Sequence, residues 1–179
     1  MEFNLLFILK ILCAAMAAVG FAVISNPPKR AVALSALLSA IAFVVRYYMH
    51  NVNGIDIASA TFGSSLVIGS MSLFFARMIH CPNEVFTFPS MLPMIPGKYA
   101  YNIFLSIAEI IRNPDNTNIP AEIYNEIFIN AITASSILVS LVIGVALPVM
   151  IFHKESFSVT RKPKILEHLR LRKHKTTTH

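Results

Sequence analysis

Long apolar runs and short polar segments alternate along this chain. The apolar runs cover residues 5–25, 31–49, 58–76, 86–111 and 126–152. Each is close to or above the roughly 20 residues that a helix needs to cross the hydrocarbon core of a membrane. The segments between them carry most of the prolines, asparagines and charges. The pattern therefore predicts an all-α membrane protein with five transmembrane helices.

The composition supports a membrane protein. The chain has 179 residues, of which 55% are hydrophobic and 13% are charged, whereas water-soluble domains are about 25% charged. Its two cysteines, Cys13 and Cys81, provide neither a disulfide framework nor the spacing of a metal site. We therefore expect an integral membrane protein without a metal site or a cofactor.

The first apolar run differs from a secretion signal in two respects. It is preceded by Glu2 rather than by a basic cluster, and it is longer than the roughly 7–15 apolar residues typical of a signal peptide. We interpret it as a retained span. Lys10 lies within it, and its side chain is expected either to extend to the membrane interface or to face the helix bundle.

The fourth apolar run contains three prolines, Pro89, Pro93 and Pro96, followed by Gly97 and Lys98. Because proline lacks an amide donor and clashes with the preceding turn, one smooth helix cannot pass through all three. Two interpretations remain, a re-entrant or interfacial loop and a membrane-spanning helix that is broken at the prolines. The residues after the glycine are too few to cross about 30 Å alone, which favours the broken helix.

Charge placement predicts the orientation of the five spans. Cytoplasmic segments of membrane proteins are enriched in Lys and Arg. With the C-terminus inside, the cytoplasmic segments hold three basic residues in loops and eight after residue 153, whereas the outer side holds only Arg46 and Arg112. The three in loops are Lys29, Arg30 and Arg77. We therefore expect the N-terminus outside and the C-terminus in the cytoplasm.

The chain is predicted to consist of two parts, a five-span membrane domain (residues 1–153) and a basic cytoplasmic tail (residues 154–179). The tail lacks interleaved aromatic residues and directly follows an apolar helix. We therefore expect it to bind anionic lipids and not nucleic acid.

Small residues predict where helices approach one another closely. Ala14, Ala18 and Ala22 recur at four-residue spacing in the first span, and Ser65 and Gly69 form a small-xxx-small pair in the third. Such residues usually pack against a neighbouring helix rather than bind a ligand.

The odd number of spans predicts an assembly. Many transporters are built from two related halves, and in an inverted repeat each half crosses the membrane an odd number of times. No internal repeat is visible in this sequence. The chain therefore has the form of one half, which needs an identical or homologous partner.

Several short stretches stand out along residues 19–150. They are VGFAV at 19–23, N-x-P-x-R-A at 26–31, TF at 61–62 with Ser65, Ile68 and Gly69, VFT at 85–87, PMIPG at 93–97 with Ala100 and Tyr101, and TASSI at 133–137 with Gly144 and Pro148. The proline-glycine block is the most specific of them. Together they resemble the C-terminal half of the threonine/serine exporter family.

This resemblance implies the small subunit of a split exporter, which works with a larger subunit of the same family or with a second copy of itself. The solutes that it implies are threonine, serine or succinate, which all present a carboxylate. The basic tail is longer than the family pattern leads us to expect.

The predicted solute site lies at the helix break. The free amides at the start of the second half-helix carry partial positive charge, and Lys98 adds a full charge. Tyr99 or Tyr101 is expected either to bond the solute or to pack. A polar run in the last span either lines the solute path or bonds to neighbouring helices. The predicted solute-binding residues are Pro93, Pro96, Gly97, Lys98, Tyr101, Asn130, Thr133 and Ser136.

Glu109 and two alternative functions remain to be considered. Glu109 is either a proton or coupling-ion site or an interfacial residue near Arg112, and the second is favoured. An intramembrane enzyme is disfavoured, because the histidines His50, His80 and His153 lie at loops or span ends rather than beside a membrane serine. A membrane scaffold that transports nothing is the alternative function.

Overall fold

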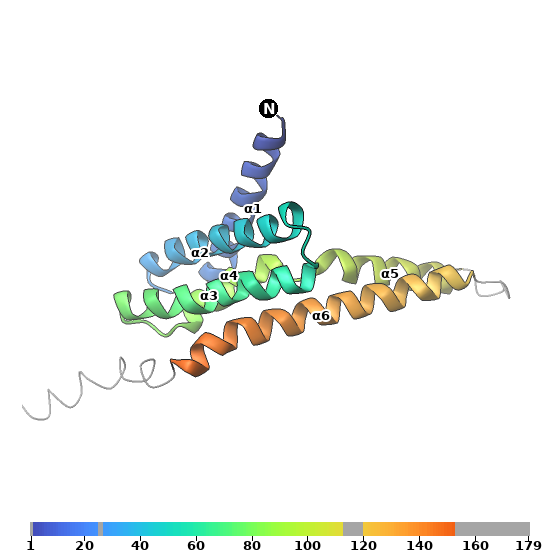
Figure 1. The fold of residues 1–179 in the computed structure, drawn as a ribbon. Helices are drawn as coiled ribbons and strands as arrows, with labels where there is room; N and C mark the ends of the chain where they lie inside the picture. Colours follow the sequence, from blue (N-terminus) through green and yellow to red (C-terminus); the bar gives the residue numbers. More distant parts are fainter. Residues whose placement is uncertain (1, 25–26, 113–119, 153–179) are drawn as a thin grey trace, which may run out of the picture.

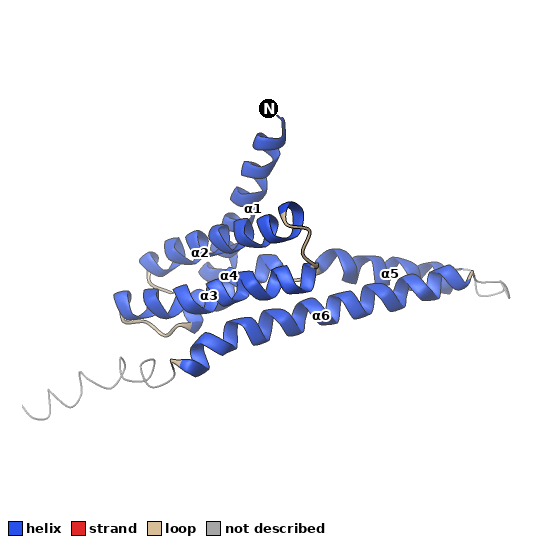
Figure 2. Ribbon diagram, viewed as in Figure 1, coloured by secondary structure: helices blue, strands red, loops and turns tan. Residues whose placement is uncertain are grey.

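The computed structural model describes residues 2–24, 27–112 and 120–152, and this part of the chain is helical throughout, without strands (Figure 1; Figure 2). A π-helical turn, η1 (Tyr48–Val52), extends the second helix, and a 3₁₀ turn, η2 (Leu92–Met94), follows the fourth. The predicted all-α class is confirmed for these residues. The α-helices are α1 (Glu2–Ile24), α2 (Lys29–Tyr47), α3 (Ile57–Ile79), α4 (Glu84–Met91), α5 (Gly97–Arg112) and α6 (Ala121–Ile151).

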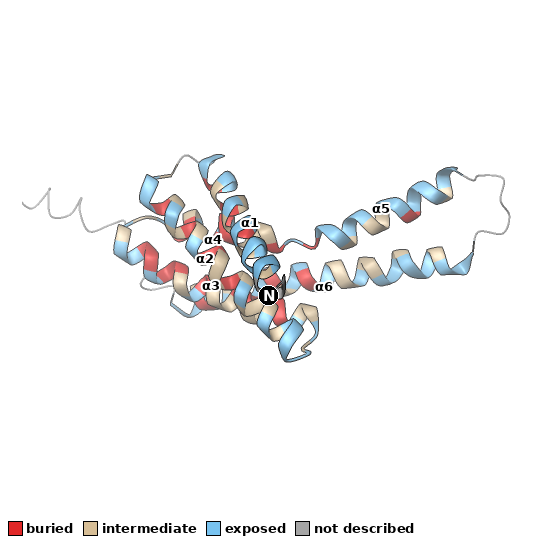
Figure 3. Ribbon diagram, turned by 90° about the horizontal axis from the view of Figure 1, so that it is seen from above, coloured by how far each residue is buried: buried red, intermediate tan, exposed pale blue. Residues whose placement is uncertain are grey.

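The helices form a bundle and an arm. In the bundle, α1, α2, α3 and α4 pack against one another. α5 leaves the bundle and packs on the first half of α6, so that the two helices project side by side (Figure 1; Figure 3). We call α5 together with residues 121–136 of α6 the arm. The second half of α6 lies along α3, so one continuous helix belongs to both parts.

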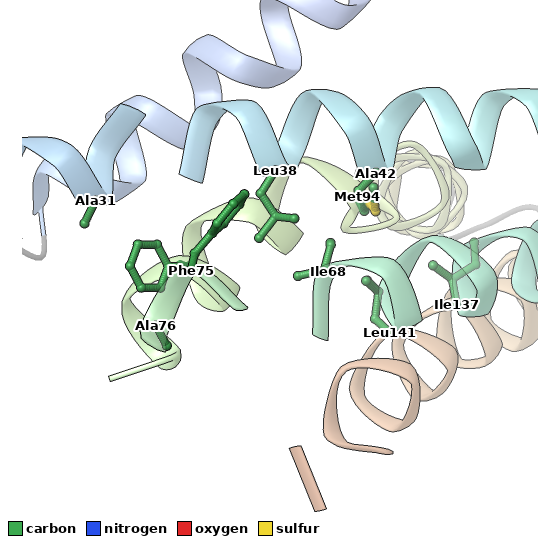
Figure 4. Close-up of a cluster of buried hydrophobic side chains, with 10 residues drawn as sticks. Ala31, Leu38, Ala42, Ile68, Phe75, Ala76, Met94, Ile137 and Leu141 are labelled. Atoms are coloured by element: carbon green, nitrogen blue, oxygen red, sulfur yellow. The ribbon is translucent and has the colours of Figure 1, made fainter. Parts of the chain in front are cut away.

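The apolar core lies where α2, α3, α4 and α6 meet (Figure 4). Leu38 of α2, Ile68 of α3 and Ile137 of α6 are fully buried there. Phe75 of α3 and Phe86 of α4 lie edge to face, with ring centroids 6.4 Å apart. The core thus fixes α4, the helix before the predicted break, firmly in the bundle.

The predicted packing role of the small residues is confirmed. A Cβ on Gly69 of α3 would lie only 2.7 Å from the carbonyl oxygen of Val145 on α6, so the two backbones are in direct contact. On α1, Ala14, Ala18 and Ala22 are all buried. The carbonyl oxygen of Ala14 accepts a hydrogen bond of 3.2 Å from Ser39 of α2. Both small-residue faces therefore contact neighbouring helices.

Buried hydroxyl groups join α2 to α4. Ser90 of α4 donates to the carbonyl oxygen of Ser35 at 3.0 Å, and Ser35 in turn donates to the carbonyl oxygen of Val85 at 3.4 Å. These bonds satisfy polar groups that would be costly to bury without a partner. They hold the first half of the broken segment against α2.

Four helical segments among the described residues are long and apolar enough to cross a membrane. They match the first, second, third and fifth predicted spans. The fourth, residues 86–111, is divided among α4, η2 and α5, none of which reaches the length of a span alone. Five spans and the sidedness stay predictions. The four segments are Leu5–Ile24, Lys29–Val52, Ile57–Ile79 and Ala121–Ile151.

Several predicted boundaries were wrong, two of them at polar stretches. Residues 50–52, expected in a loop, continue the second segment as part of η1. Residues 121–125, expected in a polar connection, form the start of α6. Pro120 directly precedes that helix with φ −56°, a torsion already suited to helix entry. Local polarity therefore did not prevent helix formation. The preceding residues 113–119, residue 153 and the predicted tail (residues 154–179) lie outside the described residues.

Candidate functional site

The backbone changes direction between η2 and α5. Ile95 is extended (φ −56°, ψ 137°), as expected for a residue that precedes proline. Pro96 then accepts hydrogen bonds on its carbonyl oxygen from the amides of Tyr99 and Ala100, at 3.1 and 3.2 Å, and α5 begins. The helical bonding pattern is therefore interrupted at the proline-glycine block and resumes one turn later.

The predicted site residues around this interruption differ in their exposure. Pro96 is buried and Pro93 is half-buried, so both belong to the packed part of the structure. Gly97 and Lys98 are exposed, and 62% of Tyr101 is accessible. Within the described residues the lysine thus lies on an open surface rather than in an enclosed pocket.

Pro93 lines a cavity of about 490 Å³ between α1, α2 and η2. Most of its walls are apolar, and Lys10 of α1 is the cation that lines it. Lys10 itself is exposed, so its side chain borders this cavity without being enclosed. A second cavity, of about 510 Å³, lies between α4 and α6, with Phe88, Met91 and Val145 among its walls.

The polar residues predicted in the last span bond to their own helix. Asn130 donates to the carbonyl oxygen of Glu126 at 2.9 Å, and Thr133 donates to that of Ile129 at 2.8 Å. Both side chains are half-buried, whereas Ser136 is exposed. These bonds leave acceptor capacity on the amide and hydroxyl oxygens, so a role toward a solute stays a prediction.

The arm brings the two groups of predicted site residues to one level. The hydroxyl of Ser106 on α5 donates to the carboxylate of Glu126 on α6 at 3.4 Å. The helices run antiparallel, and both rise by about 1.5 Å per residue. Lys98, eight residues before the serine, therefore lies level with residue 134. Asn130, Thr133 and Ser136 occupy the turns of α6 around that level.

The arm exposes a large apolar surface. Ser106 is the buried residue of α5, whereas many of the large apolar side chains of both arm helices are exposed. This exposure suits an apolar surrounding such as lipid or another apolar helix. The exposed residues include Tyr101, Phe104, Leu105, Ile111, Tyr124, Phe128, Ile129 and Ile132.

Glu109 lies on α5, one turn before Arg112, and both side chains are exposed. This position agrees with an interfacial residue, but neither the coupling role nor the interfacial role is decided by it. Both stay predictions.

Sequence reasoning missed Arg46. It was counted only as a charge on the outer side, yet it is half-buried and donates a hydrogen bond of 3.0 Å to the carbonyl oxygen of Met94. Met94 is the last residue of η2, directly before the interruption. The sequence signal was a cation inside an apolar run, which commonly marks an interior partner.

Comparison with known proteins assigns most of the chain to a family. A family model described as threonine/serine exporter matches residues 10–151, most of the described chain. The chain belongs to the threonine/serine exporter family. The resemblance identified from the proline-glycine block and the small-residue stretches is thereby confirmed, and the family is one of transporters rather than enzymes.

One relative adds information on length. An uncharacterized protein of Haemophilus influenzae is 31% identical over 153 residues, which cover 86% of this chain and 50% of the relative. The chain thus spans about half the length of that relative. No solved structure matches the chain.

Proposed function

We propose that this chain is the small subunit of a secondary exporter that moves small carboxylate-bearing solutes, threonine, serine or succinate, out of a bacterial cell. The observation that carries the proposal is the interrupted helix within the matched family region. Interrupted helices with free amides at the break build the solute sites of many transporters.

The proposed site uses the start of α5. The first amides of this 16-residue helix have a partial positive charge, and Lys98 adds an ammonium group beside them. A carboxylate bound there would face α6 at the level of Thr133 and Ser136. These hydroxyl groups can donate to or accept from the rest of the solute.

The proposed site needs a second half to close it. Lys98 and Tyr101 are exposed in the single chain, and a transport site has to be shielded from one side of the membrane at a time. The relative of about twice the length is consistent with an additional half. We propose a larger subunit of the same family, or a second copy, as that partner.

Orientation and surroundings complete the proposal. The chain would lie in the inner membrane with its N-terminus outside, and its basic tail would contact anionic lipid on the cytoplasmic side. Glu109 is proposed as an interfacial residue, with coupling as the alternative.

Counterflow in liposomes tests the proposal. Liposomes that contain the chain, with and without its larger partner, would be loaded with unlabelled solute and offered labelled threonine and labelled succinate in parallel. Accumulation of one solute that requires both halves would support the split exporter. No accumulation of either solute, from a complex shown to be folded, would contradict it.

A scaffold that transports nothing is the second candidate. The observation in its favour is the exposed apolar surface of the arm, which suits a partner protein as well as lipid. It predicts that Lys98 and the prolines of the break can be replaced without loss of activity in the assembled complex.

A further inference from the structure

The bond between Arg46 and Met94 joins α2 to the end of the first half-helix. Among the seven Lys and Arg of the described residues that have a described side chain, Arg46 alone is not exposed. Its Nη1 donates to the Met94 carbonyl oxygen at 3.0 Å. Arg46 is thus partly buried where the other six side chains are exposed, and the Met94 carbonyl oxygen is its partner there.

That carbonyl oxygen needs a partner because of the helix break. In a continuous helix it would accept from the amide of Lys98, four residues later. Here Ile95 is extended and is followed by Pro96, so the chain changes direction before the amide of Lys98 can reach this oxygen. A buried carbonyl without a donor is costly, above all in an apolar surrounding. Arg46 supplies the donor with a charge, at the negatively polarised end of α4 and η2.

Met94 is held from a second side as well. Its side chain is fully buried, with 1% accessible, and its sulfur accepts a hydrogen bond of 3.5 Å from Ser64 of α3. Tyr99, in the first turn of α5, also packs against the core. The residues on both sides of the break are therefore held by the same core.

We propose that Arg46 is a positioning residue, which fixes the direction of α5 by holding the Met94 carbonyl oxygen and thereby places the predicted solute site at the start of that helix. The importance for transport rests on the proposed function. The positioning itself concerns only this chain and can be measured without a solute.

Two distances measured between spin labels test the positioning. The native cysteines would be replaced by alanine, and labels would be attached at Phe74→Cys and Ala100→Cys, exposed positions on α3 and on the first turns of α5. A control pair, Leu37→Cys and Phe74→Cys, lies within the bundle. The distance between the labels of each pair would be measured by double electron–electron resonance spectroscopy in the reconstituted protein.

We expect Arg46→Met to shift or broaden the first distance and to leave the control distance unchanged. A charge-assisted hydrogen bond supports about a tenfold preference for the ordered arrangement, so a displaced population should be visible. Arg46→Lys, which keeps a cationic donor, should restore most of the wild-type distance. Arg112→Met, which removes an exposed cation at the other end of α5, should change neither distance.

Two results would overturn the proposal. One is an unchanged distance between the labels on α3 and α5 in Arg46→Met. The other is an equal change in both pairs, which would show that Arg46 supports the whole bundle. Should Arg46→Met not yield folded protein, Arg46→Gln, which keeps only a shorter and neutral donor, should shift the first distance by less than full loss of the bond would and leave the control distance unchanged; an unchanged first distance together with a lowered unfolding midpoint would contradict the proposal.

The transport assay separates this proposal from the proposed function. If the wild-type complex shows no counterflow but Arg46→Met displaces α5, the exporter proposal fails and the positioning role stands. If counterflow is present and Arg46→Met leaves both the rate and the distance unchanged, the positioning role fails alone.

Discussion

The hydroxyl of Ser65 on α3 donates a hydrogen bond to the carbonyl oxygen of Ser140 on α6, 3.1 Å away. This bond lies beside Gly144, where the two helices are in close contact. A Cβ on Gly144 would overlap the Ser65 hydroxyl and lie 2.9 Å from the carbonyl oxygen of Phe62. The bundle and the helix that carries the arm are therefore joined at a contact that leaves no room for a methyl group.

Gly144→Ala should destabilise the protein. The added methyl group has to displace backbone as well as a side chain, and overpacking of this kind costs about 1–3 kcal/mol. We expect a lower midpoint in thermal unfolding of the detergent-solubilised protein. Gly20→Ala on α1 is the matched control, because its Cβ would meet no atom within 4 Å. Equal midpoints for the two variants would contradict the close approach of α3 and α6.

Ser65→Gly should partly rescue Gly144→Ala. It removes the hydroxyl that the new methyl group would overlap, but the Phe62 carbonyl oxygen stays in place. A double-mutant cycle of unfolding midpoints measures the coupling between the two positions. Strictly additive effects would show that the two residues do not share this contact.

Lys98→Ala should reduce transport of a carboxylate solute by about tenfold or more, the value of a charge-assisted hydrogen bond. Assembly with the partner should be unaffected, since the side chain is exposed. Arg112→Ala, at the other end of α5, serves as the control for a general loss of positive charge. Counterflow rates of the purified complexes provide the measurement, and wild-type rates for Lys98→Ala would remove this lysine from the site.

Replacement of Ser106 should distinguish a hydrogen bond from tight packing in the arm. The bond to Glu126 is long, 3.4 Å, and side-chain hydrogen bonds within membranes average about 0.6 kcal/mol. Ser106→Ala should therefore have little effect on unfolding, whereas Ser106→Leu should separate α5 from α6. A cross-link between cysteines placed on the two helices would form more slowly in Ser106→Leu alone. Identical rates for all three proteins would argue against the buried position of Ser106.

The predicted orientation can be tested with reporters on the C-terminus. A fluorescent protein fused after residue 179 should be bright, because it folds in the cytoplasm, and a periplasmic phosphatase at the same position should be inactive. The reason is the excess of Lys and Arg on that side. The opposite pattern would contradict the predicted sidedness and, with it, the proposed location of the tail.

The sequence was sufficient to predict the four long helices and the small-residue faces through which two of them pack. Apolar run length identified four helical segments, and the small residues Ser65 and Gly69 marked a real helix contact, because such residues have few other uses in a membrane. The start of α6 was placed too late, since its first turns are polar. Pro120 provides a suitable start for these turns, and α5 packs against them. The packing of α5 cannot be read from the sequence of the turns themselves.

The site was less predictable than the fold. Pro96 and Gly97 do interrupt the helix, as local stereochemistry requires. The partner of the freed Met94 carbonyl oxygen is Arg46, which is 48 residues away along the chain. A contact of this range depends on how α2 packs against α4, and no spacing in the sequence encodes it. Exposure of Lys98 likewise depends on the direction in which α5 leaves the bundle.

The continuity of α6 connects this protein to the thickness of its membrane. At 1.5 Å per residue its 31 residues extend over about 46 Å, well beyond about 30 Å of hydrocarbon. Such a helix tilts more in a thin bilayer than in a thick one. Because α5 packs on the same helix, a change in the tilt of α6 would also move the outer end of the arm. Lipids of different acyl-chain length would then set the angle at which the arm meets its partner.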